Sequence, residues 1–272
     1  MVHANPFFYA HSFDLCGHSC NLPFIENNLR LNLVIDIGNT RTKIGLFQEN
    51  KLLEQAIWQD WTLQQLLDEA HTKGVTRIIL SSVAHPNPAL VDALSKHFFF
   101  LELTHETALP FQNSYQTPLT LGKDRLAGIA GAQNLFPKTN CLVIDCGTCI
   151  KYDLITSNAV YLGGNIAPGA AMRIKAMHHF TARLPEVAQH WPDQIIGYST
   201  ETALQNGALY GAVLEIEGFS RLFDQKLSPL QVLLTGGDAN FFFPQLAIDS
   251  LIVSNDLTMI GLNSILNFNQ HP

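Results

Sequence analysis

Two segments of this chain place an aspartate at the end of an apolar strand and follow it with a tight turn of glycine and threonine. The segments are DIGNT at 36–40 and DCGT at 145–148. Backbone N–H groups in such a turn form a concave site for phosphate oxygens. A carboxylate beside that site can hold a metal ion, or a water bound to it, against the phosphates. These residue types therefore indicate phosphate binding with the help of a cation.

Each segment lies in the pattern of a β-hairpin. Residues 31–37 form an apolar run, the turn follows, and residues 42–48 alternate as a second strand. The stretch 141–155 repeats this arrangement. A single Asp-x-Gly turn is common in ordinary hairpins, but two copies at domain-like spacing predict a duplicated unit with two facing phosphate loops.

Further strands and helices are predicted after each hairpin. In the first half, strands at 51–58, 75–83 and 98–103 alternate with helices at 61–71 and 86–97. This order is typical of a mixed sheet covered by helices. In the second half, we expect a helix from Gly122, a strand at 159–166, a helix capped by Ser199, strands at 231–234 and 251–254, and a helix at 257–267.

The composition narrows the class of protein. The chain has 272 residues, 47% of them hydrophobic and 14% charged, which is enough for two domains with their own cores. A net charge of −7 without a basic stripe disfavours a nucleic-acid partner. No apolar run reaches the roughly 18 residues of a membrane helix. Five cysteines and the lack of a secretory signal favour a cytoplasmic protein with free thiols.

Residues 1–30 differ from the rest of the chain. They mix aromatic and polar residues and contain neither a basic region nor an apolar core of a signal peptide. Their histidines and cysteines match no zinc-ligand spacing. We interpret this segment as a poorly ordered extension, or as the product of a start codon assigned too far upstream.

A loop and a helix start between the two hairpins carry further candidates. The loop at 104–121 holds Tyr115, and Gly122 to Arg125 open a helix with several small residues that permit close packing. Asp124 lies in the first turn of this helix. There it would complement the helix dipole or act as a proton acceptor. Its residue type and position alone leave both roles open. The Thr-Gly-Gly at 235–237 would let backbone approach a flat ligand such as adenosine.

Together these motifs resemble the type III pantothenate kinases of the actin and sugar-kinase ATPase superfamily. The resemblance rests on DIGNTRTK at 36–43, the interval from Tyr115 to GKDR at 122–125, DCGT at 145–148, GGNIAPG at 163–169 and the helix at Thr200. It implies an α/β protein of two ribonuclease-H-like domains, each a mixed five-stranded sheet flanked by helices, with the active site in the cleft between them. The expected domains are residues 31–121 and 122–272.

The resemblance also implies an activity and its residues. That family phosphorylates the primary hydroxyl of pantothenate with ATP, the first step towards coenzyme A, and its members are homodimers with the substrate site near the subunit interface. Asp124 matches the proton acceptor, Asp145 the site of a monovalent cation (K⁺ or NH₄⁺), and Asp36 would hold Mg²⁺ directly or through water. The ATP contacts are Asp36, Ile37, Gly38, Asn39, Thr40, Arg41, Thr42, Lys43 and Thr148, and the pantothenate contacts are Tyr115, Gly122, Lys123, Asp124, Arg125 and Thr200.

Two lysines depart from the family pattern. Lys123 stands where a small residue is usual, and it either points to solvent or adds charge near the substrate. Lys151 stands where threonine is usual, and if it faces the cleft it partly substitutes for the monovalent cation. Two other functions remain open at this point: a non-catalytic nucleotide-binding regulator of the same fold, and a kinase for another small hydroxylated substrate.

Overall fold

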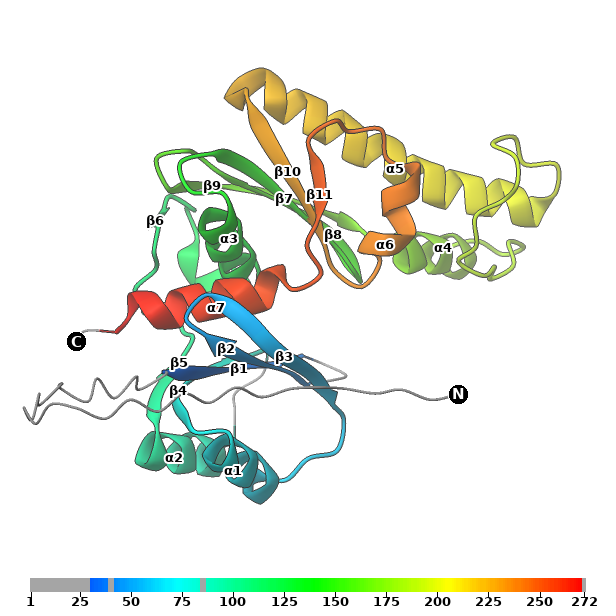
Figure 1. Ribbon diagram of the computed structural model, residues 1–272. Helices are drawn as coiled ribbons and strands as arrows, with labels where there is room; N and C mark the ends of the chain where they lie inside the picture. The colour runs from blue at the N-terminus through cyan, green and yellow to red at the C-terminus, as the bar shows by residue number, and fades with distance from the viewer. Residues whose placement is uncertain (1–29, 39–41, 84–86, 271–272) are drawn as a thin grey trace, which may run out of the picture.

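The computed structural model describes residues 30–38, 42–83 and 87–270. The expectation of a poorly ordered extension at 1–30 therefore lies outside the described residues, apart from Arg30. The same holds for Asn39, Thr40 and Arg41 in the first phosphate loop. The rest of the chain forms two lobes, each built on a mixed sheet (Figure 1).

The first lobe contains the predicted five-stranded sheet, in the order β3-β2-β1-β4-β5. Its strands are β1 (Leu31–Ile37), β2 (Thr42–Gln48), β3 (Lys51–Trp58), β4 (Val75–Ser82) and β5 (Phe99–Glu102). Strands β1 to β3 form an antiparallel meander, whereas β4 and β5 run parallel to β1. Helices α1 (Leu63–Thr72) and α2 (Pro88–His97) cover one face (Figure 1).

The second lobe has six strands within the described residues, one more than expected, in the order β11-β10-β7-β8-β9-β6. They are β6 (Gln112–Asn113), β7 (Asn140–Cys146), β8 (Cys149–Ile155), β9 (Val160–Pro168), β10 (Leu230–Thr235) and β11 (Leu251–Val253). The additional strand is β6, which pairs with the edge of β9. Two residues carry no periodic pattern, so the sequence predicted only a loop there.

The helices of the second half are α3 (Lys123–Leu135), α4 (Ala170–His179), α5 (Thr200–Leu227), α6 (Ala239–Phe242) and α7 (Leu257–Phe268). Short 3₁₀ turns occur at Pro118–Thr120 and Phe243–Gln245. The long helix α5 begins at the predicted cap, where the Ser199 hydroxyl accepts a hydrogen bond from the Thr202 N–H.

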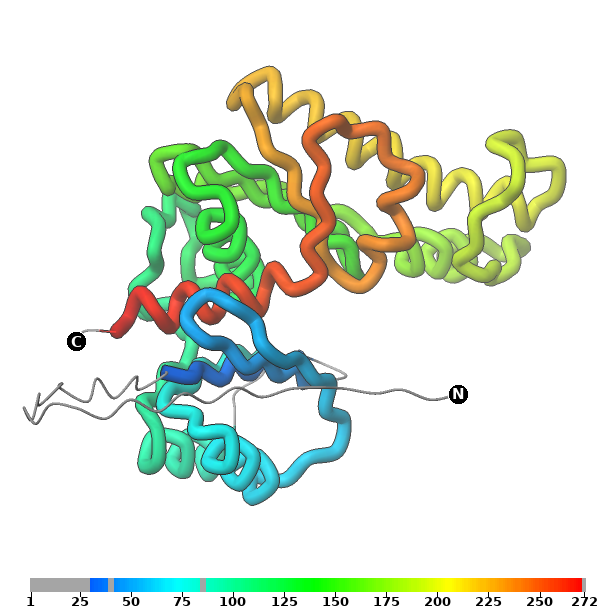
Figure 2. Tube along the Cα trace, in the orientation of Figure 1, coloured from blue at the N-terminus to red at the C-terminus, as the bar shows by residue number. Residues whose placement is uncertain are grey.

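The two sheets and their helices stack in layers. Alternate residues of β1 point to opposite faces: Leu33 and Ile35 pack towards α1 and α2, whereas Val34 packs towards α3 and α7. Helices α3 and α7 lie between the lobes, and α5 lies along the far face of the second sheet (Figures 1 and 2). The shared α3–α7 layer therefore fixes how the carboxyl ends of β1 and β7 face each other.

Glycines bring α3 and α7 unusually close, as the small residues of α3 predicted. A Cβ on Gly131 would overlap the carbonyl oxygen of Leu257, and one on Gly261 would overlap that of Ala127. The C-terminal helix also reaches the first lobe, where Asn32 Nδ2 donates to Asn263 Oδ1 at 2.7 Å. This layer thus joins residues from both ends of the chain.

We expect the Gly261→Ala substitution to lower the free energy of unfolding by about 1–3 kcal/mol, because the added methyl group forces the two helices apart. Urea denaturation measures the change. The control is Gly128→Ala in the same layer, whose Cβ would have only an ordinary contact at 3.6 Å with Val143. That variant should be unchanged or more stable by up to about 1 kcal/mol. Equal losses in both variants would contradict the close crossing.

Candidate active site

Asp36 and Asp145 occupy equivalent places in the two sheets. Asp36 lies near the carboxyl end of β1, opposite Lys43 on β2 and Ser81 on β4. Asp145 lies near the carboxyl end of β7, opposite Lys151 on β8 and Thr235 on β10. A carboxylate near the carboxyl end of a central strand is what the repeated motif predicted for both sheets.

Asp124 joins these two carboxylates from the first turn of α3. One of its oxygens, Oδ1, accepts a hydrogen bond from the Arg125 N–H at 2.9 Å, and the other, Oδ2, accepts one from Lys151 Nζ at 2.5 Å. The side chain is 43% exposed. Asp124 therefore supports the helix start with one oxygen while the other faces the neighbouring sheet, so a structural role and a chemical role do not exclude each other.

A cavity of about 470 Å³ opens between Asp36 and Asp124. Its lining consists of Asp36, Ser81, Ser82, Val83, His105, Leu121, Gly122, Lys123 and Asp124. Its size is within the range of small-molecule sites. The cavity brings together four predicted site residues, Asp36, Gly122, Lys123 and Asp124. His105 was not predicted, because an exposed histidine in a loop gives no signal in a single sequence.

The surroundings of Asp36 disfavour its charged form. Burial raises the pKa of the Asp36 carboxyl, while a hydrogen bond from Ser81 and the charge of Lys43 oppose the rise. The charges of Asp124 and Asp145 raise that pKa further. Within the described part of the chain, no cluster of three or more histidine, cysteine or acidic side chains could hold a metal alone. A single carboxylate fits Mg²⁺ nevertheless, because this ion commonly combines one or two carboxylates with waters and substrate phosphates.

Arg125 is held by a partner that the sequence prediction missed. Its Nε lies 2.9 Å and its Nη2 2.6 Å from Oδ1 of Asp153, and the Tyr161 hydroxyl donates to the same oxygen at 2.7 Å. Burial alone would lower the pKa of Arg125, but Asp153 outweighs that effect and raises it. Tyr115 stacks on Tyr161 and lies 5.3 Å beneath the Arg125 guanidinium. The available signal was the alternation of β8, which places Lys151 and Asp153 on one face.

Other predicted ATP contacts lie around the second turn and the first hairpin. Thr148 is exposed, and its carbonyl accepts a hydrogen bond from the Gly169 N–H, at the start of α4, at 3.1 Å. Thr42 is buried and accepts a hydrogen bond from the Trp61 indole at 3.2 Å, so its side chain lies on the opposite face from Lys43. Gly236, with a φ of 97°, presses against Asp145, and a Cβ there would overlap Oδ1 of that carboxylate.

Thr200 lies apart from the other predicted pantothenate contacts. It is exposed at the first residue of α5, and Figure 1 shows that α5 begins at the end of the second lobe that is remote from α3. Within one chain, the fold does not bring Thr200 to the cavity beside Asp124.

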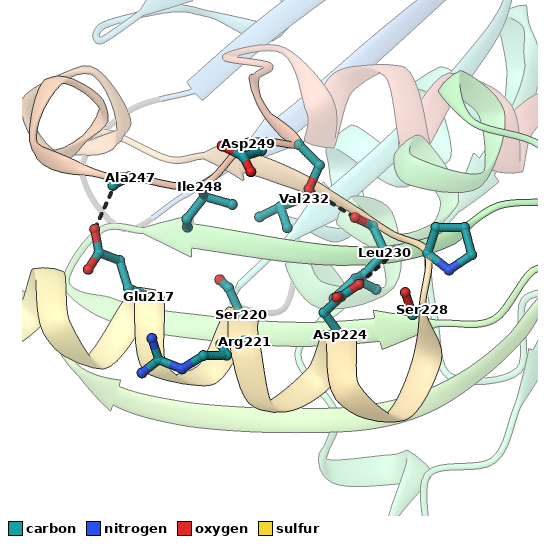
Figure 3. Close-up of a pocket in the computed structure, with 12 residues that line it drawn as sticks. Glu217, Ser220, Arg221, Asp224, Ser228, Leu230, Val232, Ala247, Ile248 and Asp249 are labelled. Atoms are coloured by element: carbon teal, nitrogen blue, oxygen red, sulfur yellow. Dashed lines mark hydrogen bonds between the residues drawn. The ribbon is translucent and has the colours of Figure 1, made fainter.

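A second cavity, of about 510 Å³, lies at the other end of α5 and contains none of the predicted site residues (Figure 3). Its polar groups support the fold: Glu217 accepts a hydrogen bond from the Ala247 N–H at 2.8 Å, and Asp224 accepts one from the Leu230 N–H at 3.1 Å. These contacts attach α5 to the start of β10 and to the segment before β11.

Comparisons with known proteins agree with the motifs. A family model of type III pantothenate kinases matches residues 32–221. The chain is 42% identical over 242 residues to the type III pantothenate kinase of Christiangramia forsetii, which covers 88% of this chain and 99% of that protein. The type III pantothenate kinase of Bacteroides fragilis is 39% identical over 240 residues and covers 88% and 98% respectively.

Solved structures support the same fold. A Campylobacter jejuni protein described as a conserved Baf family transcriptional activator superposes with a TM-score of 0.55 at 26% identity and covers 87% of this chain and 98% of its own. A glucokinase from an Antarctic psychrotroph gives a TM-score of 0.51 at 14% identity over 88% and 99% of the two chains, a likeness of fold alone. Because the family model spans most of the chain and the curated relatives align over nearly their whole length, this chain belongs to the type III pantothenate kinase family.

Proposed function

We propose that this protein transfers the γ-phosphoryl group of ATP to the primary hydroxyl of pantothenate, the first step of coenzyme A biosynthesis. The observation that carries the proposal is the position of Asp124, which lines a cavity of about 470 Å³ together with Asp36. A proton acceptor and a carboxylate suited to Mg²⁺ thus share one small-molecule site, in a chain of the matching family.

The ATP phosphates would lie between the carboxyl ends of β1 and β7, beside Asp36 and Asp145. Mg²⁺ held by Asp36 would offset the charge of the β- and γ-phosphates. Asp124 accepts the hydroxyl proton as the pantothenate oxygen forms its bond to the γ-phosphorus. The bond between that phosphorus and the bridging oxygen then breaks, and ADP leaves with the electron pair. Phosphoryl transfer of this kind depends on positioning and charge neutralisation, which these residues supply.

Pantothenate would lie along the start of α3. Lys123, which lines the cavity, would offer a positive charge to its carboxylate. Because Asp153 engages Nε and Nη2 of Arg125, this arginine is better suited to positioning Tyr115 than to a two-pronged contact with the substrate. The proposal includes a homodimer. Because Thr200 lies far from this cavity within one chain, a predicted contact of Thr200 with pantothenate would have to come from a second copy. The candidate contact is the face of α5 that carries Gly207, which is exposed, and Gly211, which is half-buried; a Cβ on either glycine would meet open space.

A cytoplasmic location completes the proposal, since ATP is available there. Within the described ranges, every helix is too short or too polar to cross a membrane.

The test is turnover of purified protein with ATP, Mg²⁺ and pantothenate, with the product identified by mass. We expect stoichiometric ADP and 4'-phosphopantothenate, and no comparable turnover with glucose or other sugars. Turnover of a sugar instead would assign another kinase activity. Folded protein that binds ATP without turnover of any substrate would favour the nucleotide-binding regulator, the alternative that the likeness to the Campylobacter jejuni protein supports.

A further inference from the structure

Lys151 forms a bridge between two carboxylates of the site. Its Nζ lies 2.6 Å from Oδ2 of Asp145 and 2.5 Å from Oδ2 of Asp124. Asp145 is its cross-strand partner on β7, whereas Asp124 comes from the start of α3. The Lys151 side chain is 18% exposed, less than either carboxylate. One ammonium group thus ties the second sheet to the helix that carries the proposed proton acceptor.

The site needs this positive charge. Burial is the main reason why the pKa of Asp36 is raised, and the nearby charges of Asp124 and Asp145 raise it further. Carboxylates gathered in this way repel one another unless a cation lies between them. Lys43 faces Asp36, which leaves Lys151 as the cation that contacts both Asp124 and Asp145 in the described structure.

The residues around Asp145 fit a lysine ammonium better than they fit a free monovalent cation. Oδ2 of Asp145 is engaged by Lys151, and Oδ1 lies against the backbone of Gly236, where even a Cβ would overlap it. A lysine ammonium carries the same single charge as K⁺ or NH₄⁺. It also has three N–H donors, of which two are directed at Asp124 and Asp145, so one remains for a phosphate oxygen.

We propose that Lys151 is a built-in replacement for the monovalent cation of this site, so that the protein needs no added K⁺ or NH₄⁺. This inference rests on the proposed kinase function. Lys151 is a positioning residue in this scheme: it holds the Asp124 carboxylate beside the cavity and offsets the charge of Asp145 as the phosphates arrive. Any catalytic need for a monovalent cation is then met by the chain itself.

The test compares the protein with two substitutions of the same lysine, each without and with K⁺ or NH₄⁺, at constant ionic strength set by choline chloride. Lys151→Thr removes the charge and leaves room for an ion, whereas Lys151→Met fills the space without a charge. We expect the unmodified protein to turn over equally with and without K⁺. Lys151→Thr should lose on the order of 10- to 100-fold in rate without the ion and regain part of it with K⁺ or NH₄⁺. Lys151→Met should lose as much and regain nothing.

A second measurement records how the same ions change the thermal midpoint of unfolding in the absence of substrates. K⁺ should raise the midpoint of Lys151→Thr and leave that of the unmodified protein unchanged. The control is Lys96→Thr on α2, which removes another ion-paired lysine, 2.7 Å from Asp92, far from the site. Its rate and its response to K⁺ should match those of the unmodified protein.

A K⁺ requirement of the unmodified protein, or a Lys151→Thr variant with no response to either ion in both measurements, would overturn the inference. The thermal measurement needs no turnover. If the protein does not phosphorylate pantothenate, K⁺-dependent stabilisation of Lys151→Thr alone still supports a built-in cation, while the kinase proposal fails separately.

Discussion

The Asp124→Asn variant should lose about 10²- to 10⁴-fold in kcat, the usual contribution of a general base. Asparagine retains the oxygen that accepts the Arg125 N–H at 2.9 Å, so the start of α3 should persist. It cannot accept the hydroxyl proton of pantothenate, and it pairs only weakly with Lys151. The rate of ADP release with saturating pantothenate measures the loss, and urea denaturation checks that the variant is folded.

The matched control for this variant is Asp92→Asn, because Asp92 is also an aspartate near a lysine, on the exposed surface of α2. Its kcat should not change. Lys151→Met serves as a second comparison, since it breaks the ion pair but retains the Asp124 carboxylate. If Asp124→Asn and Asp92→Asn were equally active, Asp124 would be only a helix-start residue, and the proposed mechanism would have no proton acceptor.

The Asp153→Asn variant should lower the free energy of unfolding by about 3–5 kcal/mol, because it leaves the buried guanidinium of Arg125 without its counter-charge. The side chains of Arg125 and Asp153 are only 5% and 3% exposed. The Tyr161 hydroxyl would also lose a charged acceptor. Chemical denaturation in urea gives the change, and circular dichroism reports whether the variant keeps its overall secondary structure.

The double variant Arg125→Met, Asp153→Leu separates an unpaired charge from lost packing. It removes both charges and should be more stable than Asp153→Asn alone, since an apolar replacement of a buried pair is often neutral. Asp92→Asn is again the surface control, with an expected change within about 0.5 kcal/mol. A loss for Asp153→Asn no larger than that of the control would show that the pair does not stabilise this fold.

Local signals in the sequence determined the strands, most helices and the position of the key carboxylates. Apolar runs place Asp36 and Asp145 near strand ends, and the hydroxyl cap of Ser199 marks the start of α5. The small residues of α3 predicted its close packing. Each of these features depends on residues that are neighbours in the chain, so a pattern over a few positions is sufficient to reveal it.

Only the tertiary structure decided which side chains meet at the site. The bridge from Lys151 to Asp124 and the pair of Arg125 with Asp153 join segments separated by 27 and 28 positions in the chain. The edge strand β6, the place of α7 between the lobes and the distance of Thr200 from α3 were likewise absent from local patterns. Such contacts depend on how the layers pack, because burial is gained by surfaces that face each other in space and not by residues that follow each other in the chain.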